Sequence, residues 1–184
     1  MPTGYTESFA GKSGDKFVIR TLLPGDATEF CSFLDNVSRE TFFTNEYPEQ
    51  PKEPEKIAAG LKALGGNPKR LWLGAFAGKV MAGFLGFKPI VGDSHPYFRH
   101  IYTFDLMILK RYWGEGLGGR FVKIVDEFSH KIGAKRIEVL VKDENDRAIE
   151  LYEKNGYQVE GTRRKSVSLE GRFVDEYYMA KLFM

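Results

Sequence analysis

The sequence contains little cysteine, little net charge and no long hydrophobic run, and each of these absences excludes a class of protein. Because Cys31 is the single cysteine, an intramolecular disulfide and a cysteine-rich zinc site are excluded, and a reducing compartment is favoured. The three histidines lack metal-ligand spacing, so we expect no metal cofactor. A net charge of +2, without a run of five Lys or Arg residues, gives no indication of a nucleic-acid partner.

The sequence also gives no indication of secretion or of a membrane-spanning segment. Residues 1–16 lack the apolar core of a secretory signal, and no apolar run approaches the roughly 18 residues of a membrane span. We therefore expect a cytoplasmic protein without a membrane partner. Its 184 residues suffice for one sizeable core, and we expect a flexible polar tail over residues 1–14 followed by a single domain over residues 15–184.

Hydrophobic periodicity predicts an α/β chain with the element order β-α-α-β-β-β-α-β-α-β-β. The predicted strands cover residues 16–22, 70–77, 80–87, 100–110 and 135–141, with two more within residues 157–184. The predicted helices cover residues 26–39, 54–65, 117–132 and 145–155. Gly78-Lys79 and Glu170-Gly171 are typical of hairpin turns. Three strands joined by tight turns before residue 110 indicate an antiparallel meander.

The most informative segment is residues 105–119, where a predicted strand leads into four glycines and then a helix. Glycines at such a junction let the backbone approach a ligand closely, because no Cβ intervenes. Free N–H groups at the start of a helix, aided by the helix dipole, bind anions such as pyrophosphate. The sequence therefore predicts a phosphate-bearing cofactor here.

A mononucleotide-binding P-loop is the first alternative for the phosphate site. Gly11-Lys12-Ser13 matches the end of that motif, but Thr6 stands where its first glycine belongs and no predicted strand precedes it. This interpretation fails.

A dinucleotide fingerprint, G-x-G-x-x-G, is the second alternative. Gly114, Gly116 and Gly119 fit the pattern, and Asp143 follows near a strand end. However, an antiparallel meander precedes these glycines and an antiparallel hairpin ends the chain, whereas a dinucleotide fold needs repeated parallel units. The surroundings argue against this interpretation.

Two spaced motifs favour a third interpretation. The first is Ile108-Leu109-Lys110-Arg111-Tyr112-Trp113-Gly114-Glu115-Gly116-Leu117-Gly118, and the second is Asn145-x-x-Ala148-x-x-Leu151-Tyr152-x-Lys154-x-Gly156-Tyr157. They resemble two motifs of the GNAT N-acetyltransferase superfamily, Val-x-Pro-x-Tyr-[Gln/Arg]-Gly-x-Gly-x-Gly and Asn-x-x-Ala-x-x-Leu-Tyr-x-Lys-x-Gly-Phe. Residues 159–164 and 175–180 look like its bacterial small-molecule and ribosomal-protein acetyltransferase branch.

The chain departs from the first motif at two positions. Trp113 stands where the family has Gln or Arg, so a side-chain phosphate contact is lost, and Lys110 replaces a frequent proline. A second register, Arg111-x-x-Gly114-x-Gly116, also fits, but it leaves Leu117 and Gly118 unaligned.

The resemblance implies a mixed, mostly antiparallel sheet of about six to seven strands flanked by about four helices. It also implies a splay between the strand at residues 100–110 and the strand at residues 135–142. Acetyl-CoA would be the cosubstrate, with its pyrophosphate on the amides of residues 114–119 and its pantetheine arm paired with the exposed backbone of residues 108–110. A backbone N–H near Ile108 would polarise the thioester carbonyl. The implied cofactor-binding residues are Met107, Ile108, Leu109, Trp113, Gly114, Glu115, Gly116, Leu117, Gly118, Gly119, Asn145 and Tyr152.

Three residues are candidates for catalytic or orienting roles. Tyr152, with an ordinary phenol pKa of about 10, can protonate the departing thiolate; alternatively it is an aromatic side chain that packs on the sheet. Asn145 suits a pantetheine contact, an N-cap, or both. Asp105 is a candidate general base, acting directly or through water, because a carboxylate in an apolar strand is costly to bury without a role. The alternative for Asp105 is a salt bridge or a solvated strand edge.

The acceptor is only weakly indicated. Phe43, Glu46 and Tyr47 lie in a loop that suits a cationic amine, although an ordinary polar loop is an alternative, and Asp175 and Glu176 would add acidity. We therefore expect acetyl transfer, by direct attack in a ternary complex, to a primary amine of a small molecule or of a protein or peptide N-terminus. The alternative is an inactive GNAT-like module that binds acyl-CoA and regulates a partner. The resemblance also allows a homodimer.

Overall fold

The computed structural model describes residues 4–92 and 95–184, and its contacts group into two compact units. The first unit comprises Met1–Phe87 and Asp105–Phe121, and the second comprises Lys88–Phe104 and Val122–Met184. Each unit is described by itself below. The expected single domain over residues 15–184 stays a prediction.

The first unit contains an antiparallel series of four strands. Strand β1 (Thr6–Ala10) pairs with β2 (Lys16–Thr21), β2 with β3 (Leu71–Ala77), and β3 with β4 (Val80–Pro89). The expected flexible tail is therefore wrong for β1. The five residues of β1 alternate between exposed and half-buried positions, and the ring of Phe9 lies 6.2 Å from that of Phe17 in β2.

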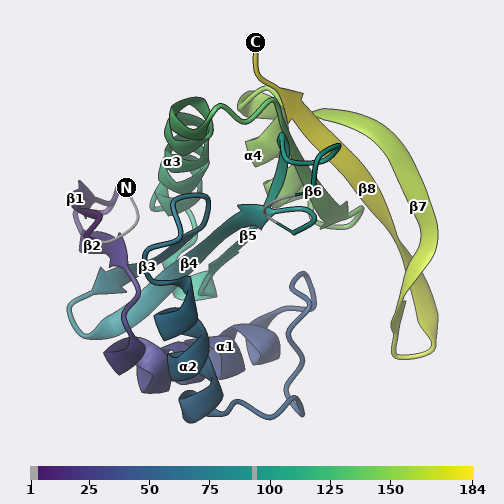
Figure 1. The fold of residues 1–184 in the computed structure, drawn as a ribbon. Helices are drawn as coiled ribbons and strands as arrows, with labels where there is room; N and C mark the ends of the chain where they lie inside the picture. Colours follow the sequence, from purple (N-terminus) through teal and green to yellow (C-terminus); the bar gives the residue numbers. More distant parts are fainter. Residues whose placement is uncertain (1–3, 93–94) are drawn as a thin grey trace. The chain divides into compact units, whose positions relative to one another are not determined.

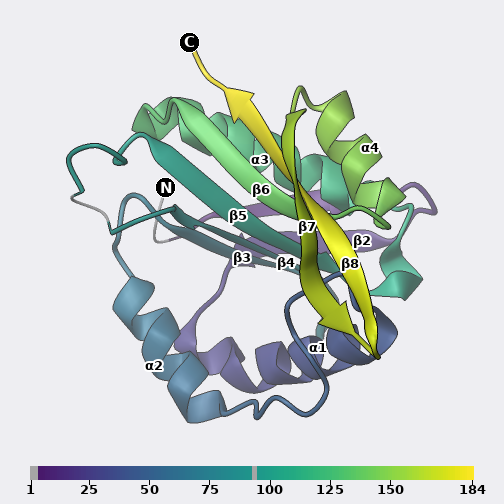
Figure 2. The ribbon, with the colours of Figure 1, turned by 90° about the vertical axis from the view of Figure 1, so that its right-hand side faces the viewer.

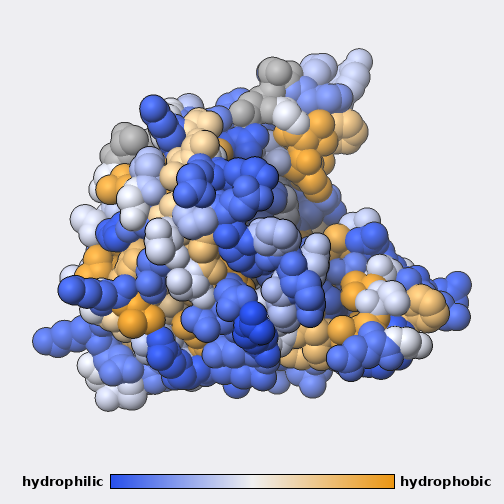
Figure 3. Space-filling view, turned by 90° about the horizontal axis from the view of Figure 1, so that it is seen from below, coloured by the Kyte–Doolittle hydropathy of each residue, from blue (hydrophilic) through white to orange (hydrophobic). Residues whose placement is uncertain are grey.

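Two helices cover one face of β3 and β4 in the first unit, as Figures 1 and 2 show. A short 3-10 turn, η1 (Pro24–Asp26), leads into α1 (Ala27–Glu40), and α2 (Pro54–Leu64) follows a loop. The side chains of α1 that face inward recur at helical spacing, which is why this segment folds as an amphipathic helix. They join a core cluster of Leu22, Phe30, Phe33, Leu34, Val37, Leu61, Phe76, Met81, Phe84 and Leu109. The view from below, in Figure 3, shows mainly hydrophilic side chains on the outward side of these helices.

The second unit is built around β6 (Arg136–Lys142). Strand β5 (Ile101–Ile108) pairs with it in parallel from Ile101↔Arg136 to Thr103↔Glu138. On its other side, β8 (Arg172–Leu182) and then β7 (Gln158–Leu169) continue antiparallel, as Figure 2 shows. Helix α4 (Asp146–Lys154) and most of α3 (Leu117–Ile132) also belong to the second unit, whereas the start of α3 belongs to the first.

The strand order of the sheet is β1-β2-β3-β4-β5-β6-β8-β7, with β5–β6 as a parallel pair. The expected fold, a mostly antiparallel sheet with four α-helices, is confirmed. Within residues 4–92 and 95–184, eight strands replace the expected six to seven, because the sequence did not predict β1. Among the described residues, no helix is long and apolar enough to cross a membrane.

Candidate functional site

The glycine loop, residues 113–119, connects a single 3-10 turn, η2 (Lys110–Tyr112), to the start of α3. Gly114 and Gly116 have φ angles of 88° and 90°, in the left-handed region where a side chain would be strained. Gly119 lies in α3, and a Cβ at Gly114 or Gly119 would meet no heavy atom within 4 Å. The space beside these two glycines is therefore open to a close ligand.

The amides of the glycine loop are available as donors. Trp113 N–H donates to Lys110 O at 3.0 Å, and Arg120 N–H donates to Gly116 O at 3.0 Å. Between them, the N–H groups of residues 114–119 have no hydrogen-bond acceptor in the part of the chain that the structure describes. Leu117 is buried, so it offers a ligand only its backbone. Unpaired amides at the start of a helix can bind an anion, and the residues at the start of this 16-residue helix fit a pyrophosphate.

The backbone before the glycine loop is less exposed than the resemblance implies. Leu109 N–H donates to Ala82 O at 3.0 Å, and Lys110 N–H donates to Glu40 Oε2 at 2.7 Å. The carbonyl of Ile108 accepts from Trp113 Nε1 at 2.8 Å. The expectation of a free edge over residues 108–110 is therefore wrong for these three groups, because Glu40 and Trp113 occupy two of them.

The second motif lies in the second unit, on α4. The Asn145 side chain caps this helix by accepting from Ala148 N–H at 3.2 Å, so the N-cap interpretation is confirmed. Tyr152 is 7% exposed, and its ring contacts the rings of Phe104 at 5.7 Å and Tyr157 at 5.6 Å. Packing of Tyr152 is thus observed, while its role as an acid stays a prediction.

A family model described as Acetyltransferase (GNAT) family matches residues 33–157. The chain belongs to the GNAT acetyltransferase family. Over 91 residues it is 29% identical to the L-amino acid N-acetyltransferase AaaT of Escherichia coli K12, covering 49% of this chain and 56% of that protein. The match thus spans little more than half the length of this curated relative.

Two solved structures show the same fold. A GNAT-family acetyltransferase from Streptococcus pneumoniae is 30% identical, with a TM-score of 0.84 and coverage of 91% of this chain and 99% of that chain. The yncA protein of Salmonella typhimurium, solved with its cofactor acetyl-CoA, is 16% identical, with a TM-score of 0.77 and coverage of 90% and 93%. At 16% identity, the second likeness concerns the fold alone.

Asp105 of this GNAT chain is exposed on β5. The premise that its carboxylate is buried among apolar residues is therefore wrong, because the side chain of Asp105 is exposed. The cost of burying a carboxylate therefore no longer supports a functional role for Asp105. A general base needs access to its substrate, which exposure allows.

The acidic residues expected near the acceptor already have partners. Glu46 Oε2 accepts from Lys52 Nζ at 2.7 Å. Glu176, 7% exposed, accepts from Arg163 at 3.2 Å, and Asp175 Oδ1 accepts from Lys165 N–H at 2.6 Å. In the loop of the first unit, the rings of Phe42 and Phe43 lie 4.6 Å apart, and Tyr47 is exposed. Tyr47 and Phe43 therefore offer contact area, whereas the charge of Glu46 is compensated by Lys52.

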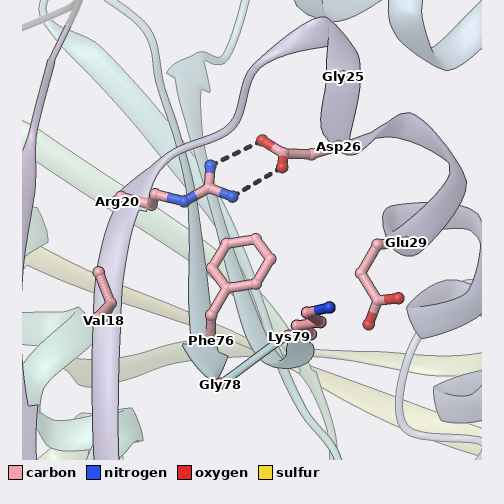
Figure 4. Close-up of a pocket in the computed structure, with 8 residues that line it drawn as sticks. All are labelled: Val18, Arg20, Gly25, Asp26, Glu29, Phe76, Gly78 and Lys79. Atoms are coloured by element: carbon pink, nitrogen blue, oxygen red, sulfur yellow. Dashed lines mark hydrogen bonds and ion pairs between the residues drawn. The ribbon is translucent and has the colours of Figure 1, made fainter.

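A surface pocket of about 400 Å³ lies elsewhere in the first unit and contains none of the expected site residues. Figure 4 shows Arg20 above the ring of Phe76 and directed at Asp26, with two 2.7 Å hydrogen bonds between guanidinium and carboxylate. Glu29, at the same pocket, accepts from Met81 N–H at 2.8 Å. These contacts tie α1 to the sheet.

Two contacts that hold the glycine loop were not predicted from the sequence. Ser13 donates to Glu115 Oε2 through its N–H at 3.0 Å and its Oγ at 2.9 Å. Arg120 contacts both Glu7 oxygens at 2.7 Å, and its hydrogen bonds lower the pKa of Glu7. One signal existed in the sequence: a carboxylate at position 115, between two glycines of a predicted anion site, needs a partner.

The P-loop alternative also fails in the structure. The strand β1 does precede Gly11-Lys12-Ser13, but β2 follows instead of a helix, so no P-loop forms.

Proposed function

We propose that this GNAT protein transfers an acetyl group from acetyl-CoA to a primary amine of a small molecule or of a protein or peptide N-terminus. Direct attack of the amine in a ternary complex is the proposed route. The observation that carries the proposal is the run of unpaired amides over residues 114–119, shaped by two glycines with positive φ and followed by α3. Family membership supplies the identity of the donor.

The residues of the first unit bind the cosubstrate in this proposal. The amides of residues 114–119 hold the pyrophosphate, and residues 107–109 lie along the pantetheine arm. Bound acetyl-CoA supplies an activated thioester. Trp113 takes part by exposing or covering the carbonyl of Ile108, to which its indole is hydrogen-bonded.

Proton transfers fall to two groups in this proposal, and a third group binds the cosubstrate. The amine arrives protonated, and Asp105, exposed on β5, removes its proton directly or through water. The Tyr152 phenol donates a proton to the departing thiolate. Asn145, besides capping α4, contacts the pantetheine. The roles of Asn145 and Tyr152 rest on the spacing of the second motif.

The name of one relative supports a small amine as acceptor. The likeness to an L-amino acid N-acetyltransferase favours a substrate that carries an amine beside a carboxylate. Aromatic contact area from Phe43 and Tyr47 suits the side chain of such a substrate. Peptide N-termini share the α-amine chemistry and stay within the proposal.

Release of free CoA, followed with a thiol reagent, tests the function. The panel comprises L-amino acids, polyamines, aminoglycosides and ribosomal-protein N-terminal peptides, with acetyl-CoA hydrolysis without amine as background. We expect thiol release above background with at least one amine. Calorimetric binding of CoA without turnover of any amine would instead support the regulatory module. Absence of CoA binding would overturn both.

A further inference from the structure

We propose that the β1–β2 turn positions the glycine loop for the cosubstrate by holding the carboxylate of Glu115. This turn contact consists of two hydrogen bonds to Glu115, from Ser13 N–H at 3.0 Å and from Ser13 Oγ at 2.9 Å. It links residues 102 positions apart in the sequence. The inference rests on the proposed function and makes Ser13 a positioning residue.

The turn is shaped to receive this carboxylate. Gly11 N–H donates to Asp15 O at 2.7 Å, and Gly14 N–H donates to Gly11 O at 3.1 Å, which closes a tight turn. A Cβ at Gly11 would lie 2.3 Å from Glu115 Oε2, so only glycine leaves room for it. The side chain of Glu115 is therefore fitted into the turn.

The charge of Glu115 makes the turn contact necessary. A free carboxylate in a pyrophosphate site would repel the ligand. Here the two Ser13 donors stabilise the ionised form, and their hydrogen bonds lower the pKa of Glu115. The carboxylate remains ionised at neutral pH, and its hydrogen bonds to Ser13 hold it in the turn.

Two further contacts fix the flanks of the glycine loop to the same hairpin. On the α3 side, Arg120 forms its two-point ion pair with Glu7 of β1. On the η2 side, the ring of Tyr112 meets that of Phe17 in β2 edge-on at 5.5 Å. A loop held at both flanks and at its centre loses less conformational entropy when a ligand binds. The hairpin β1–β2 thus pre-organises the cosubstrate site.

A double-mutant cycle tests the turn contact. Ser13→Ala, Glu115→Ala and the double variant are compared with the wild type for the Kd of CoA by calorimetry, and for KM and kcat in the thiol assay. We expect Ser13→Ala to raise Kd and KM for the cosubstrate about 2- to 10-fold with kcat unchanged, and to have no further effect once Glu115 is Ala. Ser8→Ala, an exposed position on the same hairpin, is the matched control and should bind CoA like the wild type.

Amide hydrogen exchange without cosubstrate gives a second measurement. Exchange over residues 114–119 should accelerate in Ser13→Ala and stay unchanged in Ser8→Ala, while thermal unfolding shows that both are folded. The turn contact is refuted by unchanged exchange and Kd in Ser13→Ala, or by an equal effect of that change in the Glu115→Ala background. A wild type that binds no CoA refutes the proposed function itself, whatever the exchange shows.

Discussion

The indole Nε1–H of Trp113 donates a hydrogen bond to the carbonyl oxygen of Ile108 at 2.8 Å, at the point where β5 meets the glycine loop. The first GNAT motif has Gln or Arg at the position of Trp113. Here the indole instead occupies a backbone acceptor that the pantetheine arm is proposed to use. The proposed function therefore predicts that the cosubstrate and Trp113 compete for one carbonyl.

Replacing Trp113 by Phe removes the competing donor while keeping an aromatic ring. We expect acetyl-CoA to bind about 2- to 10-fold more tightly to Trp113→Phe than to the wild type, as measured by calorimetry. In a Trp72→Phe protein, where Trp113 is the remaining tryptophan, emission should change when acetyl-CoA is added. Weaker binding by Trp113→Phe would instead assign the indole a direct role in holding the cosubstrate.

Tyr152→Phe separates the acid role of this side chain from its packing. The ring contacts with Phe104 and Tyr157 survive the change, so the Kd of CoA and the melting temperature should remain those of the wild type. Loss of the proton donor should lower kcat about 100-fold. Full turnover by Tyr152→Phe would leave this residue with packing alone.

Tyr157→Phe is the matched control for Tyr152→Phe, and we expect it to change the stability of the protein. The Tyr157 hydroxyl is buried without a hydrogen-bond partner among the described residues, and burial raises its pKa. Because removing an unpaired buried hydroxyl relieves a desolvation cost, we expect the free energy of unfolding to rise by about 1 kcal/mol. Chemical denaturation measures it; a loss of stability would show that the hydroxyl has a partner after all. The kcat of Tyr157→Phe should stay unchanged.

The ion pair of Glu7 with Arg120 predicts an acid-sensitive contribution to stability. Hydrogen bonds from Arg120 lower the pKa of Glu7 below its ordinary value of 4.5, so the folded state favours the ionised form. The contribution is therefore present above that value and is lost as the pH falls through the depressed pKa. At pH 7, Glu7→Gln should cost about 0.5–1 kcal/mol after solvent screening. Urea unfolding at pH 7 and pH 3 should show this difference shrinking; an equal cost at both would contradict the linkage.

Local patterns in the sequence were enough to predict most elements, whereas the contacts that hold the site lie far apart in the chain. The predicted helix over residues 117–132 matches α3, because its apolar spacing and the following Gly133 are local signals. The contact of Glu40 with Lys110 joins residues 70 positions apart and leaves no local signal. The exposure of Asp105 likewise depends on what covers β5, which periodicity within the strand does not contain.

Gly119→Ala separates ligand access from backbone geometry in the glycine loop. Gly119 is helical, so alanine fits its backbone, and apart from the neighbouring residues of its own helix no protein atom lies within 4 Å of the added Cβ. Helix propensity alone should then raise the free energy of unfolding by about 0.5 kcal/mol, while the methyl group fills the space beside the unpaired amides and weakens CoA binding.

Gly60→Ala in α2 is the control, because it too is a helical glycine with open space around its Cβ. It should show the same gain in stability with an unchanged Kd for CoA. Wild-type affinity in Gly119→Ala would place the pyrophosphate away from this glycine, whereas a loss of affinity in both variants would reflect helix stabilisation and not ligand approach. The two variants together therefore test whether position 119 needs glycine in order to leave space for the ligand, since the packing of the protein itself does not require a glycine there.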